Sequence, residues 1–297
     1  MPPKKSSSLI KFYNNPIYQR VTSEQAGWNF LNFQSRKMKS GETICGDTGT
    51  NEYLFVLLGG NFSAYTAKGN WVTVNGRKDV FSGLPHALYL PRHTSFTIKA
   101  ESEELDLAYG WCPVEEDYEA QFITPEDVLN SGMEFRGGDN ASRQINSILP
   151  PGSKCQRLVC VEVYTPSGNW SSFPAHKHDS RTIDPATGKV IEAELEEIYF
   201  YKIDKPQGFA IQKIYTDDKS INELVEVTNN DLVLVPRGYH PVIAGHGYNV
   251  YYLNFLAGSD QSLANTDDPN HKWIYGTWKG LDPRLPIVTI DMNYGKS

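Results

Sequence analysis

The chain has 297 residues, with 28 Lys and Arg against 35 Asp and Glu, which gives a formal net charge of −7. This acidic balance argues against a general nucleic-acid-binding protein, whose surface would be basic. Hydrophobic residues make up 39% and aromatic residues 12% of the chain, and Gly and Pro are frequent, so we expect a packed core built mainly from strands and turns.

The sequence carries no sign of a membrane segment or a disulfide framework. No stretch approaches the roughly 18 apolar residues that a spanning helix needs, and the polar, basic residues 1–8 lack the apolar run of a signal peptide. The four cysteines show no CxxC spacing, and we expect them to be buried, reduced thiols. They are Cys45, Cys112, Cys155 and Cys160. These features predict a soluble, cytoplasmic protein without membrane or nucleic-acid partners.

The first half is predicted to consist of short strands separated by turns. Residues 23–33 end in an alternating aromatic and apolar pattern that is typical of a half-buried strand. Residues 53–58 are continuously apolar and stop at Gly59-Gly60, which indicates a core strand before a hairpin. The one helical signal covers residues 124–129, where Thr124 can cap a helix that has Pro125 at its first position.

The chain becomes polar and rich in turn residues between 136 and 152, and we place the domain boundary in this region. It gives an N-terminal domain of residues 1–145 and a C-terminal domain of residues 146–297. The strand pattern then resumes, and residues 231–242 repeat the order of residue types in 80–91. This weak repeat at half-chain spacing supports an all-β fold of two similar antiparallel barrels.

The densest group of chemically active residues lies at 172–179. His176 and His178 are two residues apart, so in an extended strand both imidazoles point to the same face. Strand-like runs further along the chain bring Glu197 and His240. The first half has no such histidine pair, so only the second barrel can carry a metal site made of these four residues.

Imidazole and carboxylate ligands suit one divalent ion such as Mn, Zn, Fe or Ni. Four protein ligands around an octahedral ion leave two positions open for substrate oxygens, as catalysis requires. Side-chain alternation places Glu197 on one face with Tyr199 and Tyr201 and turns Glu196 to the other face. We therefore predict Glu197 as the ligand, with the choice between Glu197 and Glu196 depending on the long loop 184–194.

The same alternation suggests which residues line a pocket. Tyr199 and Tyr201 share the face of Glu197 and are candidate substrate-binding residues, together with Gln212 on a neighbouring strand. Core packing is the default role for any single aromatic side chain. Asp179 beside His178 can orient that histidine, but the more ordinary role of a solvated loop acid is favoured.

Longer motifs of this sequence resemble those of the bicupin 5-deoxy-glucuronate isomerase family of bacterial myo-inositol catabolism. The resemblance covers nearly the whole chain and is most specific in the second half. The motifs that carry it are 165–172, 174–179, 206–210, 215–218, 234–242 and 251–254, with shorter matches at 21–28 and 80–85.

The resemblance implies two cupin barrels of the double-stranded β-helix, jelly-roll-like type, with a divalent metal in the C-terminal barrel only. It matches residue by residue at the four proposed ligands, His176, His178, Glu197 and His240. The implied activity is the interconversion of 5-deoxy-glucuronate and 5-dehydro-2-deoxy-gluconate, without a redox cofactor.

A base must move a proton between adjacent carbons in such a reaction. The sequence does not decide which group is this base, and the candidates are Glu196, Tyr199, Tyr201 and a metal-bound water. Two other functions use the same fold, a cupin metal dioxygenase and a non-enzymatic sugar-binding bicupin. The expected partner is a small sugar acid, and formation of a homo-oligomer is left open.

Overall fold

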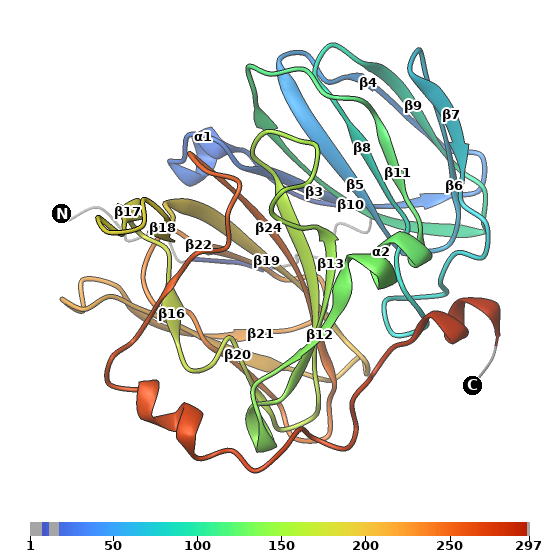
Figure 1. Cartoon of the computed structure of the whole chain (residues 1–297). Coiled ribbons are helices and arrows are strands. Elements are labelled where there is room, and N and C mark those ends of the chain that lie inside the picture. The colour runs from blue at the N-terminus through green and yellow to red at the C-terminus, as the bar shows by residue number, and fades with distance from the viewer. Residues whose placement is uncertain (1–7, 12–17, 296–297) are drawn as a thin grey trace, which may run out of the picture.

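The computed structural model describes residues 8–11 and 18–295. Two β-barrels lie one above the other, the first in blue to green and the second in green to orange (Figure 1). No helix among the described residues is long and apolar enough to cross a membrane.

The first barrel is made of two antiparallel sheets. The larger sheet has the strand order β11-β8-β5-β10-β3-β2, and the smaller one has the order β4-β9-β6-β7. The strands are β2 (Tyr18–Val21), β3 (Asn32–Lys39), β4 (Thr43–Asp47), β5 (Asn51–Gly59), β6 (Phe62–Thr66), β7 (Gly69–Val72), β8 (Ala87–Leu90), β9 (Ser95–Ala100), β10 (Glu104–Pro113) and β11 (Gln121–Ile123).

The second barrel repeats this plan. Its larger sheet has the order β1-β22-β19-β24-β14-β13-β12 and its smaller sheet the order β15-β23-β20-β21, while β16-β25 and β17-β18 form separate pairs. The strands are β1 (Leu9–Ile10), β12 (Met133–Arg136), β13 (Arg143–Leu149), β14 (Val159–Thr165), β15 (Trp170–Ser171), β16 (His176–Lys177), β17 (Thr182–Ile183), β18 (Val190–Glu192), β19 (Leu195–Ile203), β20 (Ala210–Tyr215), β21 (Asn222–Val227), β22 (Leu232–Val235), β23 (Val242–Ala244), β24 (Val250–Gly258) and β25 (Thr266–Asp267).

The larger sheet of the second barrel begins before the domain boundary expected near residue 145. Strand β12 pairs with β13, and β13 pairs with β14, so the change from one larger sheet to the other falls between β11 and β12. Each end of the chain also contacts the barrel that is remote from it in sequence. Strand β1 pairs with β22 of the second barrel, and Asn293 near the C-terminus hydrogen-bonds to Leu84 of the first.

The helices are short, and one of them corrects the sequence prediction. Helix α2 (Pro125–Gly132) begins after the Thr124 cap as expected. Residues 23–33, expected to end in a strand, begin instead with helix α1 (Ser23–Ala26) and enter β3 only at Asn32. The helix forms because Thr22 and Gln25 make a capping box that satisfies the first free N–H groups. The 3-10 helices are η1 (Asp139–Ala141), η2 (Lys272–Gly276) and η3 (Ile290–Tyr294).

The two larger sheets pack face to face and form a core shared by both barrels. Phe33 of β3 lies 5.3 Å from Phe200 of β19 and 5.8 Å from Phe255 of β24, measured between ring centroids. Gly110 of β10 leaves room for this contact, because a Cβ atom there would lie 2.5 Å from the Phe255 ring. This packing fixes β19 and β24, the strands that form one wall of the second barrel.

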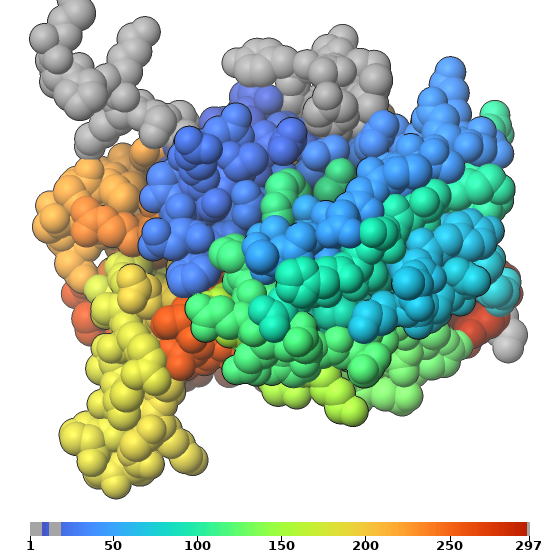
Figure 2. Space-filling model, turned by 90° about the horizontal axis from the view of Figure 1, so that it is seen from above, coloured from blue at the N-terminus to red at the C-terminus, as the bar shows by residue number. Residues whose placement is uncertain are grey.

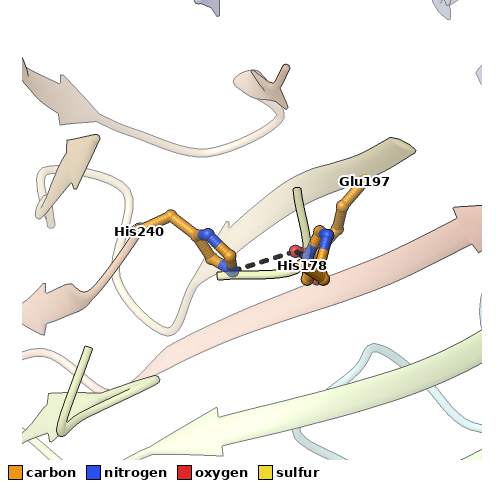
Figure 3. Close-up of side chains that lie close together, drawn as sticks. All are labelled: His178, Glu197 and His240. Atoms are coloured by element: carbon orange, nitrogen blue, oxygen red, sulfur yellow. Dashed lines mark hydrogen bonds and ion pairs between the residues drawn. The ribbon is translucent and has the colours of Figure 1, made fainter. Parts of the chain in front are cut away.

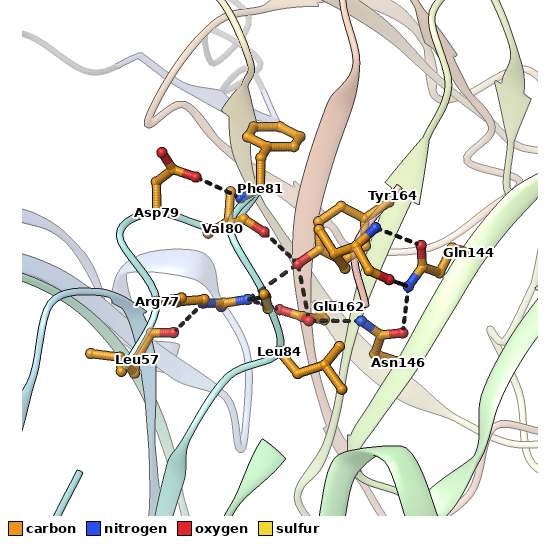
Figure 4. Close-up of polar contacts among 12 residues, drawn as sticks. Leu57, Arg77, Asp79, Val80, Phe81, Leu84, Gln144, Asn146, Glu162 and Tyr164 are labelled. Atoms are coloured by element: carbon orange, nitrogen blue, oxygen red, sulfur yellow. Dashed lines mark hydrogen bonds and ion pairs between the residues drawn. The ribbon is translucent and has the colours of Figure 1, made fainter. Parts of the chain in front are cut away.

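A buried ion pair also joins the barrels (Figure 4). Arg77, in the loop after β7, places Nη1 2.9 Å from Oε2 of Glu162 on β14, and both side chains are fully buried. Tyr164 and Asn146 complete the contacts of the carboxylate. Burial opposes the charge of Arg77, but Glu162 outweighs this effect and raises the pKa of the guanidinium.

The loop between β16 and β19 forms a separate hairpin. Strands β17 and β18 pair with each other, and in the space-filling view the yellow hairpin projects from the body of the molecule (Figure 2). The long loop at 184–194 therefore extends outward, and the register of β19 is set by its pairing with β22 and β24.

Candidate metal centre

Three side chains of the second barrel converge from separate segments (Figure 3). His178 follows the short strand β16, Glu197 lies on β19, and His240 lies in the loop between β22 and β23. One potential ligand atom from each residue lies within 4.8 Å of the others, and all three residues are buried. This is the arrangement that a metal ion with imidazole and carboxylate ligands requires.

His176 lies beside this group. The centroid of its ring is 5.0 Å from that of His240, the same separation as between His178 and His240. Strand β16 pairs with β25 rather than with the main sheet, and His176 is less buried than His178. His176 therefore lies at the open side of the group and His240 at its base.

Backbone carbonyl groups fix the orientation of two histidines. Nδ1 of His178 lies 3.1 Å from the carbonyl oxygen of Leu195, and Nδ1 of His240 lies 2.7 Å from that of Gly238. A carbonyl oxygen only accepts hydrogen bonds, so Nδ1 must carry the proton in both rings. In the neutral ring the lone pair is then on Nε2, which is the atom directed at Glu197.

The donor set fits a cation. Nε2 of His178 and Nε2 of His240 lie 2.9 Å and 3.1 Å from the same oxygen, Oε2 of Glu197. Nε2 of His240 is buried and its geometry toward Glu197 is not that of a hydrogen bond. When both rings are neutral, their Nε2 lone pairs face the carboxylate and repel it, and a cation among the three atoms, either a metal ion or the proton of a charged imidazole, turns this repulsion into attraction.

The pKa values of the group show the same coupling. Burial favours the neutral form of Glu197, but the charge of His240 and the hydrogen bond with His178 outweigh it and lower the pKa of the carboxyl group to about 2. Burial likewise disfavours the charge on His178, yet Glu197 raises its pKa. Burial and then His240 hold the pKa of His176 well below its usual range. Glu197 is thus a carboxylate at neutral pH, as a metal ligand must be.

A cavity of about 340 Å³ opens next to the group, a size that suits a small ligand. His176, His178 and Glu197 line it, and Tyr199 and Tyr252 form part of its wall. The hydroxyl group of Tyr199 lies 3.2 Å from Oγ of Ser172, and the hydroxyl group of Tyr252 lies 3.3 Å from the same atom. Burial raises the pKa of both phenols, so they are protonated and can donate hydrogen bonds at neutral pH.

The other residues selected from the sequence lie outside the cavity. Tyr201 and Gln212 are fully buried, and the tyrosine hydroxyl donates to Oε1 of Gln212 at 2.8 Å. Glu196 points to the other barrel, where its carboxylate accepts three backbone hydrogen bonds. The donors are the N–H groups of Asn29, Phe30 and Leu31, at 2.6, 3.0 and 2.7 Å.

The structure brings two further residues to the site, one that the sequence analysis undervalued and one that it missed. Asp179, interpreted as a solvated loop acid, accepts a hydrogen bond of 2.6 Å from the N–H of Gly238, whose carbonyl orients His240. It thereby ties together the two segments that carry the histidines. Arg143 lies in the cavity wall, and its only sequence signal is the alternation of Arg143, Ile145 and Ser147, three residues that line the cavity from β13.

Comparison with known proteins decides the family. A family model described as KduI/IolB matches residues 7–274. The chain belongs to the KduI/IolB family. A KduI/IolB relative from Geobacillus thermodenitrificans (strain NG80-2), named 5-deoxy-glucuronate isomerase, is 40% identical over 256 residues, which cover 86% of this chain and 90% of the relative. A protein of the same name from Bacillus subtilis (strain 168) is 34% identical and is covered over 92% of its length, against 87% of this chain.

Solved structures support the same fold. An IolB-like protein from Salmonella typhimurium LT2 superposes with a TM-score of 0.84 at 36% identity, covering 90% of this chain and 98% of that one. A mutant of Bacillus subtilis oxalate decarboxylase is only 11% identical, with a TM-score of 0.57 over 84% of this chain and 74% of its own. The second likeness concerns the fold alone, and it agrees with two cupin barrels in one chain.

Proposed function

We propose that this member of the KduI/IolB family is an aldose–ketose isomerase that converts 5-deoxy-glucuronate to 5-dehydro-2-deoxy-gluconate in myo-inositol catabolism. The observation that carries the proposal is the buried group of His178, Glu197 and His240 at a cavity of ligand size. The names of relatives that are 34–40% identical over most of the chain give the substrate.

The proposed cofactor is one divalent metal ion, held by His178, Glu197 and His240 with His176 as a fourth ligand. Such an ion, when bound, supplies electrostatic stabilisation of the negative charge that develops on substrate oxygens. The two Nε2 atoms directed at the ionised carboxylate of Glu197 support this assignment. The ligand types are compatible with Mn, Zn, Fe or Ni, and the choice among them is a matter for elemental analysis.

The reaction moves one proton from C2 to C1 of the aldehyde sugar. The aldehyde oxygen gains a proton and the C2 hydroxyl loses one, so atoms and electrons balance without a redox cofactor. Tyr199 is the favoured residue for proton exchange with these oxygens, because its hydroxyl group belongs to the cavity wall and is held by Ser172. Glu196 and Tyr201, which were equal candidates on the sequence, have their polar atoms engaged elsewhere.

An assay of the purified protein with 5-deoxy-glucuronate tests the proposal. We expect formation of the ketone without oxygen uptake, loss of activity on treatment with a chelator, and recovery on addition of one divalent metal. In D₂O, solvent deuterium should appear at C6 of the product, the carbon that was C1 of the substrate aldehyde. Oxygen uptake coupled to turnover would favour a cupin dioxygenase, and inertness of the metal-loaded protein toward sugar acids would favour a binding protein.

Two further expectations remain predictions. Cytoplasmic location fits the proposed pathway, since the relatives are named as metabolic isomerases of bacteria. Assembly into a homo-oligomer is open to measurement by sedimentation.

A further inference from the structure

Arg143 begins strand β13 and faces the interior of the second barrel. Arg143, Ile145 and Ser147 alternate along the strand and line the cavity, while Gln144 and Asn146 point to the opposite face. Arg143 is 8% exposed. Its guanidinium is therefore a buried cation at the wall of the candidate active site.

Arg143 has no carboxylate partner among the described residues. Its one hydrogen bond runs from Nη1 to the carbonyl oxygen of Phe173 at 3.3 Å. Burial lowers the pKa of the guanidinium, and the groups that oppose this effect are tyrosines such as Tyr252 and not carboxylates. Arg77, the other buried arginine, shows the contrast, because Glu162 lies 2.9 Å from it.

The other charged groups of the cavity are already paired. Glu197 faces the histidines, and Oε2 of Glu134 lies 2.7 Å from Nε of Arg136. Arg136 stands directly opposite Arg143 in the β12–β13 pair, but its side chain is half exposed. Arg143 is thus the cavity cation that lacks an anion in the described part of the chain.

A buried, unpaired charge costs several kcal/mol, so its presence in a binding cavity calls for a ligand that supplies the opposite charge. A guanidinium binds a carboxylate through two parallel hydrogen bonds. The contact with Phe173 places Arg143 near the segment that carries His176. Arg143 and His176 also line a second cavity that adjoins the first. An acid held at Arg143 would therefore extend toward the histidine group.

We propose that Arg143 binds the carboxylate of the substrate and makes the enzyme selective for sugar acids over neutral sugars. This inference rests on the proposed isomerase function and adds the residue that recognises the end of the substrate remote from the reacting carbons. Arg143 then fixes the direction in which the sugar chain lies, with the carboxylate at β13 and the aldehyde at the histidine group.

The test compares 5-deoxy-glucuronate with 5-deoxy-glucose, in which a CH₂OH group replaces the carboxylate. Arg143→Gln should lower kcat/KM for the acid by about 100-fold or more, mainly through KM, because a buried charge pair loses one partner. Turnover of the neutral sugar should change by less than about threefold, and Arg143→Lys should recover part of the loss. Equal losses on both substrates, or no loss on the acid, would overturn the inference.

Two other arginines serve as matched controls. Arg136→Gln removes the neighbouring charge on β12, and Arg181→Gln removes an exposed arginine paired with Asp260; both should keep the preference for the acid. If Arg136→Gln abolishes the preference and Arg143→Gln keeps it, Arg143 is the wrong residue. Unchanged metal content and melting temperature in Arg143→Gln would show that the fold and the metal group are intact.

A binding measurement separates this inference from the proposed reaction. If the wild-type protein does not isomerise 5-deoxy-glucuronate, the proposed function fails, but the carboxylate site can still be tested by calorimetry with D-gluconate and its neutral counterpart D-glucitol. The wild type should prefer gluconate by about tenfold or more, and Arg143→Gln should lose this preference. A wild type without such a preference would refute the carboxylate site.

Discussion

The two barrels share a strand plan but differ in what fills their interior. Strands β5 and β19 occupy the same place in their sheets. Strand β5 lies between the long strand β10 and the short strand β8, and β19 lies between the long strand β24 and the short strand β22; each short strand is followed by a proline. Tyr53 of β5 pairs with Trp111 and Leu90, whereas Glu197 of β19 pairs with Leu256 and Val235. The register thus makes Tyr53 the counterpart of Glu197.

Aromatic packing replaces the site in the first barrel. The rings of Tyr53 and Trp111 stack 5.4 Å apart, and Phe55 contacts Tyr109 and Phe96 with centroids 5.0 Å and 5.2 Å apart. In the second barrel the corresponding wall holds Glu197 and a cavity. The same barrel therefore serves as a packed scaffold when rings fill it and as a candidate enzyme site when ligands and smaller side chains leave space.

The largest expected effect comes from the position that distinguishes the barrels. Glu197→Gln keeps the shape of the side chain but removes the negative charge that the two histidines share. Isomerase activity should fall on the order of 10³-fold or more, with loss of bound metal by elemental analysis. The matched variant Tyr53→Phe in the first barrel should stay within about threefold of wild type. A fully active, metal-free Glu197→Gln protein would contradict the proposed site.

The second test concerns the contact between the barrels. Arg77→Met leaves Glu162 buried without its partner and should lower the free energy of unfolding by about 3–5 kcal/mol, measured by denaturant titration. The double variant Arg77→Met/Glu162→Gln should recover much of this loss. Lys37→Met, which breaks the exposed pair with Glu104, should cost less than about 1 kcal/mol. Similar losses at Arg77 and Lys37 would show that the buried pair has no special role.

Local sequence patterns predicted Glu197 but not Arg143, and the reason is physical. Alternation within one strand separates Glu197 from Glu196, and the structure places these two side chains at the cavity and at the barrel interface. Arg143 stands in a polar, turn-rich stretch that we interpreted as a domain boundary. Its place in the cavity depends on pairing with β14, a long-range contact that no local pattern reveals.

The positions of the histidines could also be predicted only in part from the sequence. The spacing of His176 and His178 predicted two imidazoles on one strand face, but β16 is only two residues long and pairs with β25 near the end of the chain. His178 is held in place by the carbonyl of Leu195 and His240 by that of Gly238. These backbone contacts depend on loop conformations, which the residue types alone do not determine.

The third test uses acid on the metal-free protein. The pKa of Glu197 is lowered to about 2 in the folded state, so the carboxylate stabilises the fold above its unfolded pKa of about 4.3, and this contribution is lost as the pH falls toward 2. Glu197→Gln should therefore differ from wild type by on the order of 2 kcal/mol at pH 5 and by much less at pH 2.5. Unfolding curves at both pH values measure this difference. A gap that stays constant between them would show that Glu197 is not stabilised as a charge.

The last test concerns Glu52 and Glu196, the two glutamates that directly precede Tyr53 and Glu197. Glu52 accepts backbone hydrogen bonds from Gln156, Arg157 and Leu158, in the loop between β13 and β14 of the second barrel. Glu196 accepts three from residues 29–31 before the first barrel's strand β3. Each barrel thus holds the other through one carboxylate.

Glu196→Gln and Glu52→Gln should each lower the free energy of unfolding by about 1–3 kcal/mol, since one amide group replaces an oxygen that accepts hydrogen bonds. Both variants should retain wild-type kcat within about twofold, measured below their unfolding temperatures. This result matters most at Glu196, the neighbour of the proposed ligand. If Glu196→Gln lost activity while remaining folded and metal-loaded, Glu196 would take part in the reaction. Glu196 and Glu52 would then not have the same purely structural role at the contact between the barrels.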